Sequence, residues 1–295
     1  NEDSTLNFSF DANTFNDVDS GDSLTYAATL EDDSSLPIWL TFTPSTRNFS
    51  GTPTNDDVGT ISIKVTATDT SSASASDVFA LTINNTNDAP TVANAIADQS
   101  VNEDSILNFS YDANTFNDVD SGDSLTYAAT LDDDSSLPTW LTFTSSTKNF
   151  SGTPTNDDVG TISIKVTATD TSSASISDVF ALTINNTNDS PTVANSIADQ
   201  SINEDSELNF SFDTNTFNDV DNGDSLTYSA TLDDDSNLPT WLTFTSSIRT
   251  FSGTPTNDNV GTLSIKVTAT DTSSASTSDI FVLTINNTND TPTVA

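Results

Sequence analysis

The stretch "TISIKVTATDTSSASISDVFALTIN" (residues 161–185) contains two runs of alternating apolar and polar residues, separated by a short polar segment. Apolar residues take every second position from Ile162 to Ala168, and Phe180 and Ile184 lie on one face of the second run. A period of two is typical of a strand with one buried face. The residues "DTSSAS" favour a turn between the runs, so the stretch predicts two long strands joined by a turn.

The same pattern extends outward from this stretch. The runs "ILNFSY" (106–111), "SLTYAATL" (124–131) and "TWLTF" (139–143) are short and strand-like, and "DSGD", "FSGTP" and "DDVG" supply turn residues between runs. No window shows a convincing helical period of 3.6 residues. Six or seven strands within roughly 100 residues, each with one buried face, predict an antiparallel β-sandwich.

This unit occurs three times, because "NEDSTLNFSF", "NEDSILNFSY" and "NEDSELNFSF" begin at residues 1, 102 and 203, a period of 101. Residues 1–88 and 102–189 differ at seven positions, which indicates recent duplication, so recurrence alone does not mark a functional residue. The predicted fold class is all-β, with three tandem antiparallel β-sandwiches of Ig-like, Greek-key type. The predicted domains are 1–88, which lacks its first strand in this segment, 89–189 and 190–290, followed by the start of a linker at 291–295.

The connections between units are short and contain proline. They read "NNTNDAPTVANAIADQS" (84–100) and "NNTNDSPTVANSIADQS" (185–201), and the second half of each predicts the first strand of the next unit. This leaves about four to six residues between domains, too few for a free linker. We therefore expect the ends of neighbouring domains to lie close together.

The composition excludes several classes of function. The chain has 44 acidic and 6 basic residues and a net charge of −38, which disfavours nucleic acid and anionic membranes as partners. It has no Cys, His or Met, which excludes disulfides, zinc or copper sites with N and S ligands, and His-based catalysis. No apolar run of about 18 residues predicts a membrane span. The chain opens abruptly on "NEDSTL", so we expect a fragment of a longer polypeptide.

The acidic residues are concentrated in one loop of each unit. The loop reads "FNDVDSGDSLTY" at 15–26 and 116–127 and "FNDVDNGDSLTY" at 217–228. Calcium takes six to eight oxygen ligands, and closely spaced Asp residues repel one another unless a cation neutralises them. The loop is not an EF-hand, because position 12 counted from Asp17 is Ala28 and no helix flanks it. One loop supplies too few ligands for calcium, and a solvated turn is the alternative.

The sandwich architecture indicates where further ligands come from. If the strands run from end to end, "DVDSGD", the Asp of "TATD" and the incoming linker meet at one pole, while "NED" and the outgoing linker meet at the other. Domains stacked head to tail would then place Glu2 and "NTND" of one unit opposite Asp118, Asp120 and Asp170 of the next. Such a joint would gather seven or more oxygen donors.

These motifs together resemble cadherins, and in particular the dystroglycan-type cadherin-like domains of large bacterial surface adhesins. The matching elements are "NED", "DVD", "TATD" and the linker "NTNDAP", with the body "LPxWLxF…FSGTPTNxDVG…SIKVTATD". The resemblance covers essentially the whole chain. It implies Ca²⁺ at interdomain joints that rigidify an extender rod, extracellular at a bacterial surface or secreted, with a role in cell adhesion and biofilms. The partners that it implies are calcium, neighbouring domains, and a polysaccharide or surface protein.

The resemblance also implies which residues bind the metal. Two departures from the family pattern are Asn85 and Asn186, where the linker usually begins with Asp, and the absence of a Leu-Asp-Arg-Glu segment. The expected ligands are Glu2, Asn85, Asn87, Asp88, Asp118, Asp120 and Asp170 at the first joint, and Glu103, Asn186, Asn188, Asp189, Asp219, Asp221 and Asp271 at the second. Weaker candidates are Asp17, Asp19 and Asp69, which have no upstream partner in this segment, Asp56 and Asp57 as substitutes for the missing Glu, and Asp123 and Asp224.

Other interpretations remain open. The segment could be a calcium-dependent carbohydrate-binding or homophilic-binding module, or a passive acidic spacer that binds no metal. Trp39, Trp140 and Trp241 suit a core anchor better than a sugar-stacking platform, and the acidic runs at 31–35, 132–136 and 233–237 suit solvated loops. Without His, and with small domains that offer no evident cleft, the sequence predicts no enzyme.

Overall fold

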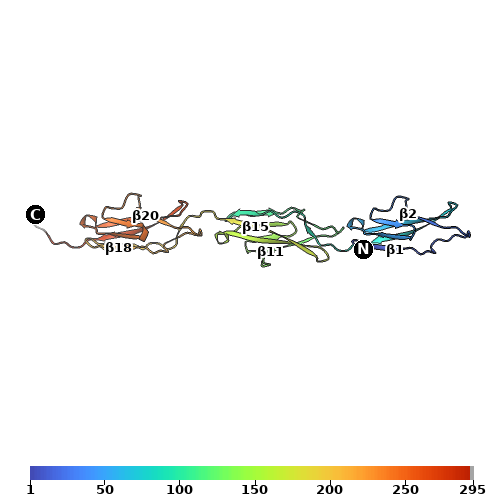
Figure 1. Cartoon of the computed structure of the whole chain (residues 1–295). Helices are drawn as coiled ribbons and strands as arrows, with labels where there is room; N and C mark the ends of the chain where they lie inside the picture. Colours follow the sequence, from blue (N-terminus) through green and yellow to red (C-terminus); the bar gives the residue numbers. More distant parts are fainter. Residues whose placement is uncertain (293–295) are drawn as a thin grey trace. The chain divides into compact units, whose positions relative to one another are not determined.

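The computed structural model of the chain describes residues 1–292. It confirms the predicted fold class, because β-strands form three repeated sandwiches whose sheets face one another (Figure 1). Of the linker predicted at 291–295, residues 293–295 lie outside the described part of the chain.

The first repeat consists of two three-stranded sheets, ordered β1-β4-β3 and β2-β5-β6. The longest strands, β5 and β6, pair antiparallel from Gly59 opposite Ile83 to Thr68 opposite Ser74. The elements are β1 (Leu6–Ser9), β2 (Thr25–Leu30), β3 (Leu40–Thr43), β4 (Asn48–Gly51), the 3₁₀ turn η1 (Asn55–Asp57), β5 (Gly59–Thr68) and β6 (Ser74–Ile83).

The second repeat has nine strands, more than the six or seven predicted, and its larger sheet is ordered β11-β14-β15-β8. The smaller sheets are β12-β13-β9 and the pair β10-β7. The elements are β7 (Thr91–Val92), β8 (Gln99–Asn102), β9 (Leu107–Ser110), β10 (Phe116–Asn117), β11 (Thr126–Leu131), β12 (Leu141–Thr144), β13 (Asn149–Gly152), η2 (Asn156–Asp158), β14 (Gly160–Thr169) and β15 (Ser175–Asn185).

The third repeat has the same architecture, with sheets β17-β24-β23-β20, β18-β22-β21 and β16-β19. It differs by an additional 3₁₀ turn before β22. The elements are β16 (Thr192–Val193), β17 (Gln200–Asn203), β18 (Leu208–Ser211), β19 (Phe217–Asn218), β20 (Thr227–Leu232), β21 (Leu242–Thr245), η3 (Ser246–Ile248), β22 (Thr250–Gly253), η4 (Asn257–Asn259), β23 (Gly261–Thr270) and β24 (Ser276–Asn286).

The first strand of each complete repeat departs from the sequence prediction in two ways. The prediction gave one strand after the linker, whereas the structure has two short strands, β7 and β8, separated by residues 93–98. Carboxylates hold the intervening segment to the sheet, because Asp178 Oδ2 accepts from Ile96 N at 2.6 Å and Asp98 Oδ1 accepts from Ala181 N at 2.8 Å. In the third repeat this strand also pairs in parallel, β17 with β24, within an otherwise antiparallel sandwich.

Each core is built on alternating apolar residues and an aromatic cluster. Ile164, Val166 and Ala168 have no exposed surface, as the alternation in β14 predicts. Phe150 is also fully buried, and its ring centroid lies 5.2 Å from that of Phe109. These compact cores hold the loops and the linkers that carry the acidic residues.

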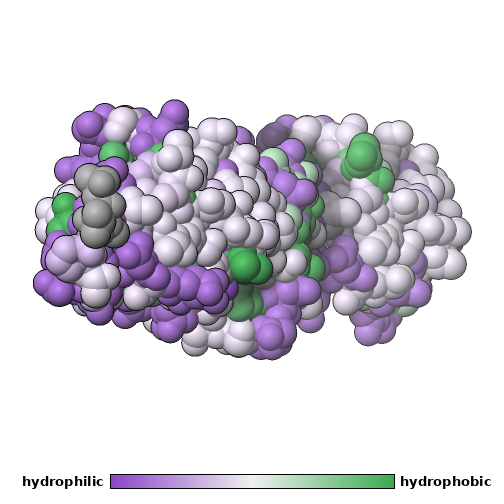
Figure 2. All heavy atoms as spheres, turned by 90° about the vertical axis from the view of Figure 1, so that its left-hand side faces the viewer, coloured by the Kyte–Doolittle hydropathy of each residue, from purple (hydrophilic) through white to green (hydrophobic). Residues whose placement is uncertain are grey.

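Exposed apolar side chains are scattered over the face of the molecule drawn in Figure 2. Figure 2 shows isolated hydrophobic side chains among hydrophilic and weakly polar ones, and the most exposed large apolar residues are Ile38, Val18 and Ile106. Within residues 1–292, no helix combines the length and the apolar character that crossing a membrane requires.

Candidate metal centre at the joints between repeats

The acidic loop of the second repeat, residues 118–123, folds into a tight turn between β10 and β11. Asp118 Oδ1 accepts a hydrogen bond from Asp120 N at 3.0 Å, and the Asp120 carbonyl accepts one from Asp123 N at 3.2 Å. Gly122 has a φ of +98°, a left-handed conformation that a residue without Cβ adopts readily. The turn therefore places Asp118, Asp120 and Asp123 in one short loop.

Burial in this loop is the reverse of what hydrophobicity predicts. Val119 is 53% exposed, whereas Asp120 is 7% exposed. Asp170, which follows β14, is 6% exposed, and oxygen atoms of Asp118, Asp123 and Asp170 lie within 4.8 Å of one another. Buried like charges are costly unless a cation or hydrogen-bond donors compensate them.

The incoming linker contacts this acidic cluster directly. Asp88 N donates to Asp120 Oδ2 at 2.8 Å, and Asn87 Nδ2 donates to Asp170 Oδ2 at 2.9 Å. The equivalent contacts recur between the next linker and the third repeat, from Asp189 N to Asp221 Oδ2 at 2.8 Å and from Asn188 Nδ2 to Asp271 Oδ2 at 2.9 Å. We call these two regions the first joint, around Asn87 and Asp88, and the second joint, around Asn188 and Asp189.

A buried glutamate contacts the other side of each linker. Glu2 is 1% exposed, its backbone N donates to Asn84 O at 3.1 Å, and its Oε1 accepts from Thr86 N at 2.6 Å. Glu103 is likewise 1% exposed and accepts from Thr187 N at 2.7 Å. The structure thus places "NED" beside the outgoing linker and "DVDSGD" beside the incoming one, the arrangement inferred from the sequence.

Several oxygen atoms of this region are buried without a hydrogen-bond partner. At the first joint they are Glu2 Oε2, Asn55 Oδ1, Asp118 Oδ2, Asp120 Oδ1 and Asp123 Oδ2, and at the second Glu103 Oε2, Asp219 Oδ2 and Asp224 Oδ2. The ion pairs within residues 1–292 all involve other carboxylates, those of Asp33, Asp134 and Asp235. The donor set consists of carboxylate and amide oxygens, which suits a hard divalent cation such as calcium.

The structure adds an asparagine that the sequence analysis missed. Asn55 Nδ2 donates to Asp88 Oδ2 at 2.6 Å, while its Oδ1 is buried and unpaired. At the second joint, Asn156 Nδ2 lies 3.2 Å from Asp189 Oδ2 and 3.1 Å from Asp221 Oδ1. The Asn156 amide donates hydrogen bonds to two carboxylates and so offsets part of the cost of burying them without a cation.

The two aspartates proposed as substitutes for the missing glutamate are placed differently. Asp57 Oδ2 accepts from both Thr54 N and Thr54 Oγ1 at 2.9 Å, so this carboxylate caps the 3₁₀ turn η1, and Asp56 is exposed. The Thr-x-x-Asp pattern of a capping box was the available sequence signal. It assigns Asp57 to the cap and leaves Asn55 facing the linker.

The remaining predicted residues divide between the joints and the solvent. Asn186 Nδ2 donates to Asp221 Oδ1 at 3.1 Å, whereas Asn85 is exposed and has no hydrogen bond among the described residues. In the first repeat Asp17 and Asp19 are exposed and Asp69 is half-buried. Asp123 and Asp224 accept from Thr171 and Thr272 at 2.5 Å, which orients each toward its cluster. Their roles as ligands stay predictions.

The linker also lowers the pKa of one carboxyl group of the cluster, that of Asp170. The Asn87 amide lowers the pKa of Asp170 below its ordinary value, with further help from backbone donors. A lowered pKa stabilises the fold above the ordinary pKa of Asp, and this contribution is lost as pH falls through the lowered pKa. We expect Asn87→Ala to raise the pKa of Asp170, measured by NMR titration in chelator. Asn188→Ala is the control and should raise the pKa of Asp271 without changing that of Asp170. An unchanged pKa of Asp170 in Asn87→Ala would contradict the Asn87–Asp170 contact.

Comparison with known families identifies the repeats. A family model described as "Putative Ig domain" matches residues 1–84, 89–185 and 190–286. The chain belongs to this Ig-domain family. The three matches of the Ig-like repeats are separated by residues 85–88 and 186–189, the segments that contact the acidic clusters.

Curated relatives of the Ig-like repeats include an adhesin. The "Serine-rich adhesin for platelets" of Staphylococcus aureus (strain USA300) is 34% identical over 146 residues, which cover 49% of this chain and 6% of that protein. The version from strain MRSA252 matches with the same identity and covers 10% of its length. The chain therefore corresponds to a small part of these relatives.

Solved structures similar to the Ig-like repeats include cadherin domains. Mouse cadherin-23 EC22–24 matches with a TM-score of 0.55 and 15% identity, over 90% of this chain and 86% of that one. Protocadherin gammaB7 EC3–6 matches with a TM-score of 0.55 and 15% identity, over 89% of this chain and 66% of that one. At this identity the comparison establishes a shared cadherin-like fold.

Proposed function

We propose that this chain is a calcium-binding segment of a bacterial surface adhesin, built from dystroglycan-type cadherin-like repeats with calcium at each joint. The observation that carries the proposal is the pair of nearly buried carboxylates, Asp120 and Asp170, that the linker contacts and no basic side chain neutralises within residues 1–292. We propose repeat boundaries at 1–88, 89–189 and 190–290, so that each linker belongs to a joint.

The oxygen atoms that lack partners support calcium as the metal. At the first joint, Asp118, Asp120 and Asp123 each present one unpaired buried oxygen, and Glu2 and Asn55 present two more. Calcium accepts six to eight oxygen ligands in flexible geometry, whereas Mg²⁺ requires a near-ideal octahedron. When bound, calcium supplies positive charge that removes the repulsion among these carboxylates.

The linker contacts explain how ion binding would change the relation between repeats. Asp88 contacts Asn55 of the preceding repeat through its side chain and Asp120 of the following repeat through its backbone. A ligand that needs groups from both repeats favours the one arrangement that brings them together. Without the cation, repulsion favours arrangements in which the carboxylates separate, so calcium rigidifies the joint.

The relatives support a location outside the cell. Calcium sites of extracellular modules bind with dissociation constants of about 10⁻⁴–10⁻³ M, a range suited to extracellular calcium. The match to an adhesin supports a role in adhesion at a bacterial surface. In this proposal the segment is a spacer that extends a binding domain away from the cell, and the adhesion contributes to biofilms.

Thermal unfolding in calcium and in chelator tests the proposal. A ligand present at 100 times its dissociation constant stabilises the native state by about 2.7 kcal/mol, so we expect calcium to raise the melting temperature by several degrees. Magnesium at the same concentration is the control and should act more weakly. Equal melting temperatures in calcium and chelator would rule out the metal centre.

A further inference from the structure

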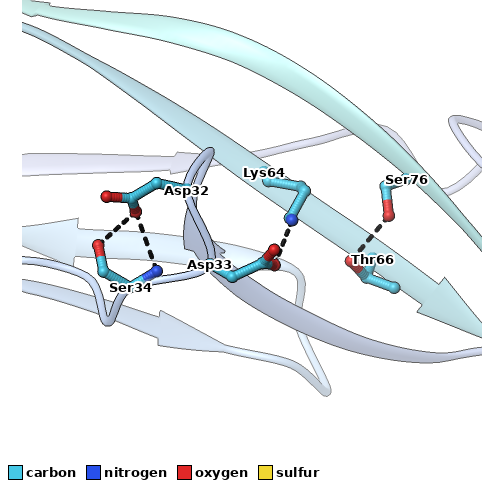
Figure 3. Close-up of polar contacts among 6 residues, drawn as sticks. All are labelled: Asp32, Asp33, Ser34, Lys64, Thr66 and Ser76. Atoms are coloured by element: carbon cyan, nitrogen blue, oxygen red, sulfur yellow. Dashed lines mark hydrogen bonds and ion pairs between the residues drawn. The ribbon is translucent and has the colours of Figure 1, made fainter.

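The few basic residues of this chain divide into two sets of three. Lys64, Lys165 and Lys266 form ion pairs with Asp33, Asp134 and Asp235, and Figure 3 shows the first of these pairs beside the Asp32–Ser34 turn. The other set comprises Arg47, Lys148 and Arg249, which occupy the same position in each repeat and form no ion pair within residues 1–292. In a chain with 44 acidic residues, cations that pair with no carboxylate in the described residues call for an explanation.

Local backbone conformation does not explain these cations. Arg47, Lys148 and Arg249 have φ values of 55°, 54° and 53°, in the left-handed region. Asn and Gly adopt that region more readily than Arg or Lys, so the turn itself does not require a long cationic side chain. The charge therefore points to a role of the side chain.

Each of the first two cations lines a shallow pocket with a tyrosine and hydroxyl groups. Around Lys148 the lining consists of Leu125, Thr126, Tyr127, Ser145 and Ser146, and around Arg47 it consists of Leu24, Thr25, Tyr26, Pro44 and Ser45. The Lys148 ammonium lies 5.0 Å from the centroid of the Tyr127 ring. Neither lining includes a carboxylate, and the Lys148 ammonium donates a long hydrogen bond to the Ala113 carbonyl at 3.5 Å.

The guanidinium groups also have donors without acceptors. The Nε atoms of Arg47 and Arg249 are buried and have no hydrogen-bond partner. Buried donors are rarely left unpaired in folded proteins, and a guanidinium N–H pairs most strongly with an oxyanion. Since these Nε atoms are buried while Arg47 as a whole is half-buried, a bound carboxylate or sulfate would pair with the rest of the guanidinium rather than with Nε.

We infer that this pocket, which we call the basic–tyrosine pocket, binds an acidic glycan. The carboxylate or sulfate of the sugar would pair with Arg47 or Lys148, its hydroxyls would bond to the neighbouring Ser and Thr side chains, and its ring would contact the tyrosine. The net charge of −38 repels a densely charged polyanion, whereas a glycan with widely spaced charges gains hydroxyl and ring contacts as well. Equivalent cations in three repeats allow avidity for a repeating polymer.

Binding of the whole segment to immobilised glycans tests this inference. Hyaluronan presents carboxylates, chondroitin sulfate also presents sulfates, and dextran is the uncharged control. The test variant is Arg47→Gln/Lys148→Gln/Arg249→Gln. The matched control is Lys64→Gln/Lys165→Gln/Lys266→Gln, which changes the net charge by the same amount at the paired lysines. Each measurement is made in calcium and in chelator, so that failure of the metal centre is distinguishable from failure of the pocket.

The expected result is binding to an acidic glycan and not to dextran. Loss of the three cations should weaken binding about tenfold or more, because both pairing and avidity are lost, while the matched control stays within about twofold. Binding to hyaluronan identifies a carboxylate as sufficient, and binding to chondroitin sulfate alone identifies a sulfate. The variant Arg47→Lys/Arg249→Lys keeps the charge and should retain binding, which separates loss of charge from loss of folding.

Three outcomes would overturn the inference. The first is that the wild type retains neither acidic glycan. The second is that the two triple variants weaken binding equally, because the effect would then follow net charge alone. The third is that poly-L-glutamate binds as tightly as the glycans, which would assign the pocket to acidic protein segments instead.

Discussion

Replacing Asp118 and Asp120 by Asn is expected to abolish calcium binding at the first joint and to leave the second joint unchanged. The substitution keeps the shape of both side chains and removes two negative charges from the cluster that the linker contacts through Asp88 N. Carboxylates contribute most of the affinity of a calcium site. Without them, we expect the dissociation constant to rise above about 10⁻³ M, the upper end of the range for extracellular modules. Isothermal titration calorimetry with calcium should show that the heat of binding at the first joint is lost and that at the second joint is retained.

The first repeat supplies a matched control for this double variant. Asp17 and Asp19 form the same turn, with Asp19 N donating to Asp17 Oδ1 at 2.8 Å, but both are exposed and no linker residue of the described chain contacts them. Asp17→Asn/Asp19→Asn should therefore change calcium binding much less than Asp118→Asn/Asp120→Asn. Equal losses from the two double variants would show that the acidic loop binds calcium without the linker, and the joint would not be the site.

Glu103→Gln is expected to destabilise the protein in calcium but not in chelator. Glu103 is 1% exposed, and its Oε2 is buried without a partner, so in chelator the protein carries an uncompensated buried charge. The effective penalty for burying an ion is several kcal/mol, and a neutral amide avoids much of it. In chelator, Glu103→Gln should therefore leave the free energy of unfolding unchanged or raise it.

In calcium the same variant should be less stable than the wild type. The carboxylate then has a cation to pair with, and the amide replaces a charged ligand with a neutral one, so the calcium-dependent increment in the free energy of unfolding falls by about 1–3 kcal/mol. Denaturant unfolding in both conditions measures the two effects. Glu207→Gln, at an exposed carboxylate, is the control and should be neutral in both. Destabilisation of Glu103→Gln by the same amount in calcium and chelator would indicate a purely structural carboxylate.

Alternation of apolar residues was sufficient to predict the strands of each sandwich. Ile164, Val166 and Ala168 are fully buried because a period of two places them on the inner face of β14. The segment after the linker was harder to predict, because Asp98 and Asp178 hold residues 93–98 to the sheet, and backbone bonds to Thr115 O involve only Ala93 and Asn94. A carboxylate 82 residues away in sequence leaves no local pattern from which to find the break between β7 and β8.

In the candidate site, too, residues close together in the sequence could be predicted, whereas contacts between distant residues could not. Asp118, Asp120 and Asp123 lie in one turn, so their spacing was visible in the sequence and predicted part of a cation site. The part played by Asn55 depends on its contact with Asp88, 33 residues away, and on the capping of η1 by Asp57. The sequence analysis sought a carboxylate to replace the missing Leu-Asp-Arg-Glu segment and therefore selected Asp56 and Asp57. The neighbouring Asn55 was overlooked because its amide carries no charge.

Small-angle X-ray scattering of the segment in calcium and in chelator tests the joint directly, because it reports the distribution of distances between the repeats. We predict that calcium narrows this distribution and increases the maximum dimension, since the linker contacts then hold each pair of repeats in one arrangement. Asp118→Asn/Asp120→Asn should lose part of this change and Asp17→Asn/Asp19→Asn should keep it. Superimposable curves in calcium and chelator would contradict the proposal that calcium fixes the joints.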